Sequence, residues 1–352
     1  MSKDIANLSL NAAGPAPLAR ATLRKTLVVC GALTVLLLLI GTIAATLGSE
    51  RLPLLDALRA LFTGGVNSGA LTPTQRAILF DIRLPRILLA ATVGASLAAA
   101  GASYQALLRN ALAEPFLLGI SNGAAVGTMV ALVFFNANEW TRPAMAFVGA
   151  LGATFVVYRL ARGRTGASPE RLILAGVIVM TFQSSAIVFI TTLMDATRIR
   201  SFTFWLLGDL SQAASGSLWI AAVSTIAGVM ALTFRARQLN LLMLGERDAF
   251  DLGVEVERVR LQVFLAASLL VGVSVALSGS VGYVGLVVPH LVRMSTSGDS
   301  RLAIPATALA GASFVVVADT LARTVIAPRE LPVGAITALI GAPLFIYLLK
   351  RQ

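Results

Sequence analysis

Residues 26–49 read TLVVCGALTVLLLLIGTIAATLGS and contain no charged side chain. A helix needs about 20 mostly apolar residues to cross roughly 30 Å of hydrocarbon, and this stretch is long enough. It is too long for the apolar core of a signal peptide, which has about 7–15 residues. We therefore predict a retained transmembrane helix over 27–48, with Cys30 as one of its small apolar residues.

The composition of the whole chain extends this conclusion. Of the 352 residues, 57% are hydrophobic and 13% are charged, and the mean hydropathy is +0.84. Soluble domains carry about 25% charged residues, so a soluble enzyme and a disordered protein are excluded, and one cysteine cannot support a disulfide scaffold. The sequence predicts an all-α integral membrane protein with one transmembrane domain, 27–349, between the tail 1–26 and the short C-terminus 350–352. With 27–48, nine further apolar runs bring the number of transmembrane helices to about ten: 86–108, 115–135, 143–161, 172–194, 217–234, 260–279, 282–297, 302–320 and 332–349.

Lysine and arginine residues set the predicted orientation, because cytoplasmic loops hold more of them. With both termini in the cytoplasm, 18 of the 28 basic residues fall inside and 10 fall outside. This bias accounts for the net charge of +11 without a nucleic-acid partner. The long external segments are 49–85, with a short helix over 54–62, and 195–216, with an amphipathic stretch in the interface plane. The three tryptophans fall where an outer aromatic belt is expected: Trp140, Trp205 and Trp219.

Two stretches of small residues echo each other five spans apart. GASLAAAG occupies 94–101 and GVSVALSG occupies 272–279, with Gly, Ser, Ala and Gly at the same offsets. Helices five spans apart cross in opposite directions, so the echo predicts an inverted repeat. The alternative is that small residues recur wherever membrane helices pack closely. The span at 282–297 contains Pro289 and predicts a bent or broken helix, with the neighbouring His290 in a structural role.

Chemistry-bearing groups are scarce. The spans contain almost no mid-membrane Asp, Glu or Lys of the kind that carriers use. The sequence has no metal-ligand cluster, no hydrolytic triad and no P-loop for ATP. We therefore predict a non-enzymatic chain without metal or cofactor, either a passive pore or a subunit that another protein drives.

The polar segment 235–259 allows two interpretations. Leu244-Gly245 and Leu252-Gly253 bracket a short predicted helix that carries Ala249 and Phe250. Glycines at both ends would let two short helices fold into a knob that seats in a soluble partner. The alternative is a solvated, charge-rich loop.

Several motifs together carry a family resemblance, and each is weak alone. They are RLPR at 83–86, GASLAAAG at 94–101, RNALAEP at 109–115, VGLVVPH at 284–290, ELPVG at 330–334 and GAP at 341–343. From about residue 80 to the C-terminus, the chain resembles the FecCD-type permeases of ATP-binding-cassette (ABC) importers for iron–siderophores, haem and cobalamin. The resemblance implies a type II ABC importer permease fold of ten helices, in the inner membrane, paired with itself or with a paralogue.

The resemblance also implies roles for particular residues. Arg83, Arg86 and Arg323 would dock a periplasmic or lipoprotein substrate-binding protein. Asn110 and Leu112 would form an inner gate, although position 111 is alanine where the family usually has proline. The second gate, near 167–170, is too divergent for residues to be assigned. The coupling residues, which would seat in two cytoplasmic ATPase subunits that bind ATP and Mg²⁺, are Leu244, Gly245, Ala249, Phe250, Leu252 and Gly253.

The scarcity of charge suits a bulky chelate better than a bare ion, which would need a ring of oxygen ligands. Among the cargoes that the resemblance implies, we expect an iron–siderophore complex. The alternatives are cobalamin or haem within the same family and, in another class, a stand-alone secondary carrier.

Overall fold

The computed structural model describes residues 22–48, 50, 52–62, 71–135, 140–163, 166–211, 215–296 and 298–350. Most of the predicted tail 1–26 and the last two residues therefore lie outside the described residues. The first half of the chain forms α1 (Leu23–Thr46), α2 (Leu54–Phe62), α3 (Pro73–Ala77), the π-helix η1 (Ile78–Arg83), α4 (Leu84–Leu107), the 3₁₀-helix η2 (Pro115–Leu118), α5 (Ile120–Phe134), α6 (Thr141–Ala161), the hairpin β1 (Arg162–Gly163) and β2 (Gly166–Ala167), and α7 (Pro169–Thr191). The second half forms α8 (Ala196–Leu206), α9 (Ser215–Phe234), α10 (Ala236–Leu244), α11 (Glu246–Asp251), α12 (Val256–Ser278), α13 (Val284–Ser295), α14 (Ser300–Thr324) and α15 (Val333–Lys350).

Ten apolar helices lie where the sequence predicts them: α1, α4, α5, α6, α7, α9, α12, α13, α14 and α15. Among the described residues, six are long and apolar enough to cross a membrane individually, and α9 with α10 forms a further span bent by 49°. The remaining three are shorter than a full span. For α13, 12 residues reach only about 18 Å, which agrees with the predicted broken helix.

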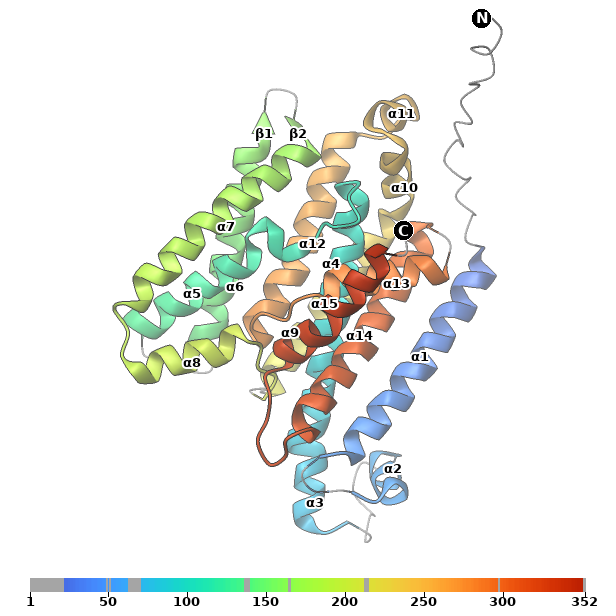
Figure 1. Cartoon of the computed structure of the whole chain (residues 1–352). Helices are drawn as coiled ribbons and strands as arrows, with labels where there is room; N and C mark the ends of the chain where they lie inside the picture. The colour runs from blue at the N-terminus through green and yellow to red at the C-terminus, as the bar shows by residue number, and fades with distance from the viewer. Residues whose placement is uncertain are drawn as a thin grey trace, which may run out of the picture.

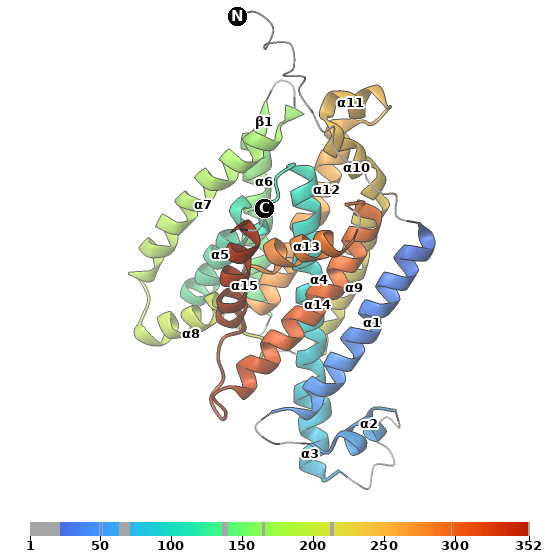
Figure 2. The same cartoon turned by 45° about the vertical axis from the view of Figure 1, so that its right-hand side comes forward.

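The helices form one bundle with two distinct ends (Figure 1). We call the end that carries β1, β2, α10 and α11 the hairpin end, and the end that carries α2 and α3 the α2 end. In both views α1 begins, and α15 ends, toward the hairpin end (Figure 2). An even number of crossings would produce this arrangement, with the two termini on one side.

Packing between the two halves follows the predicted inverted repeat. Helix α4 packs on α13 and α14 of the second half, and its counterpart α12 packs on α5 and α6 of the first half. A Cβ at Gly94 would overlap the carbonyl oxygen of Gly311, and one at Gly101 would overlap that of Gly285. The small residues of the echo therefore let helix backbones approach closely.

The two copies of the echo differ at their last glycine. Gly101 lies inside α4, whereas Gly279 ends α12 with φ +69° and stands against the carbonyl of Trp205. The first helix of the pair therefore runs on past the echo, and the second stops there.

Three predicted boundaries or placements are wrong. The span expected at 115–135 begins as a helix only at Ile120, because 115–118 forms a 3₁₀ turn that ends at Gly119, with φ +73°. The span expected to begin at 86 instead belongs to a continuous helix that begins at Pro73 and ends at Leu107. Thr72 caps the start of this helix. Trp205, expected in the aromatic belt, is buried and stacks on Phe202, with ring centroids 6.1 Å apart.

The two helices that the sequence predicts to be external agree better with expectation. The helix α2 covers 54–62 as predicted, and α8 lies within 195–216, crosswise to α7 (Figures 1 and 2). The side chains of Trp140 and Trp219 are largely exposed, as belt residues would be.

Candidate functional site

Three arginines gather at the α2 end, where η1 meets α4 and where α14 ends. Arg83 is the last residue of η1, Arg86 lies in the first turn of α4, and Arg323 lies in the last turn of α14. The π-helix is a wider turn just before Pro85, which has no backbone N–H to donate within the helix. Residues more than 230 positions apart in sequence thus meet in one cluster.

The cluster is organised around a buried carboxylate. Asp319 is 1% exposed and accepts from Arg86 Nε at 2.9 Å through Oδ1 and from Arg323 Nε at 3.1 Å through Oδ2. Arg86 Nη1 also donates to Glu330 Oε2 at 2.7 Å, and the Glu330 side chain is 48% exposed. A buried carboxylate is costly unless it is paired and hydrogen-bonded, and two arginines meet this need.

The other contacts tie the end of α1 to the cluster. Arg83 Nη1 donates to the carbonyl of Ala45 at 2.9 Å, and Nη2 donates to the carbonyl of Glu50. Arg323 Nη2 donates to the carbonyl of Ala44 at 3.4 Å. The three arginines are therefore buried and engaged internally, with exposed fractions of 4–7%. Sequence reasoning brought them to one end but missed Asp319 as the shared partner of Arg86 and Arg323, and their docking role stays a prediction.

At the hairpin end, segment 235–259 folds into two short helices, α10 and α11, as the first of the two interpretations expects. Gly245 joins them with φ +145°, and Gly253 follows α11 with φ +83°, backbone conformations that side chains rarely adopt. Ala249 is fully buried against the rest of the knob. The segment is therefore a built element and not a solvated loop.

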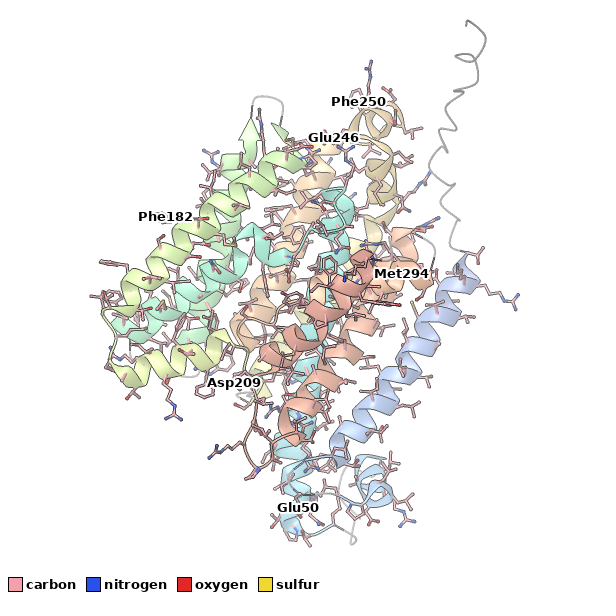
Figure 3. The ribbon with its side chains drawn as sticks, in the orientation of Figure 1. Glu50, Phe182, Asp209, Glu246, Phe250 and Met294 are labelled. Carbon is pink, nitrogen blue, oxygen red and sulfur yellow. The ribbon has the colours of Figure 1, made fainter. Side chains whose placement is uncertain are left out.

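The outer face of this knob is apolar. Leu244, Phe250 and Leu252 are 51%, 70% and 62% exposed, although the surrounding residues are charged. Figure 3 shows Phe250 at the tip of the molecule's hairpin end. Exposed apolar patches of this kind mark contact surfaces, so the geometry suits a partner protein; the coupling role itself stays a prediction.

A buried arginine links this knob to the hairpin. Arg260 of α12 is 4% exposed, and its guanidinium pairs with Glu257 at 3.2 Å and with Glu246 of α11 at 2.5 Å. Glu257 in turn accepts the Tyr158 hydroxyl of α6 at 2.8 Å and the Ala167 N–H of β2 at 3.2 Å. Sequence reasoning missed this network, for which the signal was an arginine within an apolar span with a glutamate three residues before it.

The turn expected to form the inner gate also lies at the hairpin end. Arg109 has φ +48°, and Asn110 Oδ1 accepts the Leu112 N–H at 2.8 Å. The amide side chain thus fixes the turn where alanine replaces the family's proline. Leu112 is 50% exposed, a position open to a moving partner, and the gate role stays a prediction.

His290 on α13 is buried, and its ring lies edge-on to Phe345 of α15 at 6.4 Å between centroids. This setting agrees with a structural role. Within the described ranges, no group of three or more His, Cys, Asp or Glu residues could hold a metal ion.

Known proteins resemble this chain over most of its length. The hemin transport system permease protein HmuU of Yersinia pestis is 40% identical over 316 residues, covering 85% of this chain and 94% of the relative. The cobalamin import system permease protein BtuC of Halobacterium salinarum is 38% identical over 345 residues, covering 96% and 91%. A solved inward-facing ABC transporter, assigned to the metal-chelate type, superposes with a TM-score of 0.82 at 30% identity and covers 92% of this chain and 99% of its own.

These likenesses and the apolar helices together indicate a multi-pass permease of the inner membrane. The FecCD family model matches residues 35–351, nearly the whole bundle. The chain therefore belongs to the FecCD transport family, as an ABC importer permease.

Proposed function

We propose that this chain, paired with a second permease, carries a bulky metal chelate inward, with an iron–siderophore complex as the first candidate. Relatives named for hemin and cobalamin support the chelate class and make these two molecules the next candidates. The hairpin end lies in the cytoplasm, because the predicted inside segments hold most of the basic residues. The α2 end then faces the substrate-binding protein.

The outward face of α7 supports a role in the cargo path. It combines large exposed apolar side chains, among them Phe182 (Figure 3), with exposed hydroxyls at Thr181, Ser184 and Ser185. Thr181, for example, satisfies its hydroxyl on its own helix, at the carbonyl of Val177. A chelate that has both apolar and polar surface would find matching groups on this face. A second permease chain facing α7 would close the path.

The observation that carries the proposal is the Arg260 network. Two ATPase subunits would seat the α10–α11 knob through Phe250 and its apolar neighbours. Movement of α11 would then pass from Glu246 through Arg260 to Glu257, and from there to the hairpin that leads directly into α7. The knob is thus joined to the path by paired charges, which transmit a displacement because breaking them leaves buried charge unpaired.

Docking at the α2 end would use the arginine cluster by exchange. Glu330 is the exposed member of the Arg86 pair, so a carboxylate of the binding protein can take its place without exposing Asp319. Such exchange would orient the binding protein and speed its association more than it would raise the binding affinity.

The proposal is tested with the permease and its ATPase purified together and reconstituted in vesicles with the binding protein. We expect ATP-driven uptake of one chelate class when ferric siderophore, haem and cobalamin are offered separately. Preferential uptake of haem or cobalamin would replace the siderophore complex as the proposed cargo but would leave the permease role unchanged. Uptake that persists without ATPase, driven by a proton gradient, would instead establish a secondary carrier.

A further inference from the structure

An open polar cavity of about 450 Å³ lies between α10, residues 252–254 after α11, and the start of α12. Arg235 and Arg237 line it from the start of α10, and Arg258 lines it from α12. Gln238 and Gln262 complete its polar wall. The cavity opens beside the knob, and Leu252 and Gly253 at the end of the knob also line it.

The charge of this cavity is unbalanced. Arg258 pairs with Glu255 at 3.2 Å, whereas Arg235 and Arg237 have no ion-pair partner within the described part of the chain. The side-chain oxygens of Gln238 and Gln262 are buried and accept no hydrogen bond there. The wall thus offers two free cations and two acceptors for hydroxyl groups, and it suits an anion that also carries hydroxyls.

The cavity continues into an apolar, outward-facing strip of the membrane span. Phe234, which directly precedes Arg235, is 76% exposed, and Met230 lies one turn further along α9 at 51%. On α12, Leu265 and Leu269 are 43% and 45% exposed and share a face with Gln262. Helices α9 and α12 pack together, so their apolar strips adjoin below the cavity.

We propose that this cavity binds the headgroup of an anionic phospholipid of the cytoplasmic leaflet, with phosphatidylglycerol as its simplest form. The phosphodiester would lie between Arg235 and Arg237, and the glycerol hydroxyls would donate to the glutamine oxygens. The acyl chains would follow the strip below Phe234. Basic pockets between helices on the cytoplasmic side recognise such headgroups, and a soluble anion would leave the apolar strip unused.

The test is native mass spectrometry of the detergent-purified permease–ATPase complex with phosphatidylglycerol, phosphatidylcholine or inorganic phosphate added. We expect retention of phosphatidylglycerol but not of phosphatidylcholine, and no displacement by millimolar phosphate. The double variant R235Q/R237Q should weaken retention roughly thirtyfold, since each arginine near a membrane surface contributes about fivefold. R235K/R237K keeps the charge and should keep the lipid.

The matched control is R198Q/R200Q, which removes two arginines from α8 at the opposite end. It should leave retention unchanged. Equal retention of both lipids, displacement by phosphate, or equal loss in the control would overturn the lipid site. So would lipid bound to the free permease but expelled by the ATPase, because the cavity would then be a protein contact. These outcomes concern only lipid and leave ATP-driven uptake as a separate result.

Discussion

The free-energy cost of removing a charge from water explains how the buried charged side chains of the bundle are arranged. Asp319 and Arg260 are almost fully buried at opposite ends, and each is held by two groups of opposite charge. In both clusters the outer partners are partly exposed glutamates: Glu330 in the first, and Glu246 and Glu257 in the second. Each cluster thus has a buried part that fixes the structure and an outer part that a partner can reach.

Removal of the Glu330 charge should help docking. In E330Q, Arg86 loses its outer competitor but keeps Asp319, so the binding protein should bind about two- to fivefold more tightly, the range of an exposed ion pair. Surface plasmon resonance with the reconstituted complex measures this change. D195N, which removes an exposed carboxylate from the Arg198 pair, is the control and should change nothing. Weaker docking by E330Q would mean that Glu330 itself contacts the partner.

Loss of Arg260 should uncouple transport from ATP hydrolysis. R260M retains bulk but frees Glu246 from Glu257, and we expect assembly with the ATPase to survive while chelate moved per ATP falls. Stability should drop by about 1–3 kcal/mol, because a buried charged hydrogen-bond network is lost. Parallel assays of uptake and phosphate release measure the ratio. R159M, at an exposed arginine of the same end, should transport normally, and an unchanged ratio in R260M would rule out this link.

The sequence placed Arg83, Arg86 and Arg323 at one end but could not foresee their burial. Asp319, the shared partner of Arg86 and Arg323, lies 233 positions from Arg86, and only the packing of α4 on α14 brings the two together. Local sequence showed Glu257 three residues before Arg260 but carried no sign of Glu246, which lies on another helix.

Hydropathy predicts elements well where lipid sets their length and less well where protein does. All ten apolar helices were located, yet the start of α5 and the extension of α4 back to Pro73 were missed. Pro115 and Leu118 of the 3₁₀ turn are buried against protein and do not face lipid, so an apolar run there does not imply a membrane-crossing helix.

The knob should depend on its exposed phenylalanine. F250E places a charge on the face that we assign to the ATPase without touching buried Ala249, so the ATPase should no longer copurify. F250L keeps the apolar character and should assemble normally. Gel filtration of the permease alone checks that the fold is intact. Normal copurification of F250E would show that another surface holds the ATPase.

Because α4 approaches α13 closely at Gly101, a larger side chain at this position should destabilise the fold. In G101A the new methyl group would overlap the carbonyl of Gly285, costing about 1–3 kcal/mol. In G152A the methyl group meets no atom within 4 Å, so this variant should be as stable as the parent. Thermal unfolding in detergent compares the two. Equal melting temperatures would contradict the packing that defines the inverted repeat.

At the scale of the whole molecule, the chain is a permease bundle with a buried arginine cluster at one end, a knob at the other and an apolar body between them. The family and the fold followed from ordered motifs spread over some 270 residues. The cargo did not, because relatives of similar identity are named for different cargoes, hemin and cobalamin.

Uptake into vesicles tests the central claim most directly. Vesicles that contain the permease alone and vesicles that contain it with its ATPase are loaded with ATP, and accumulation of the chelate is followed after external binding protein is added. We predict uphill accumulation only with the ATPase present, abolished by F250E. Uphill accumulation by the permease alone would contradict the account.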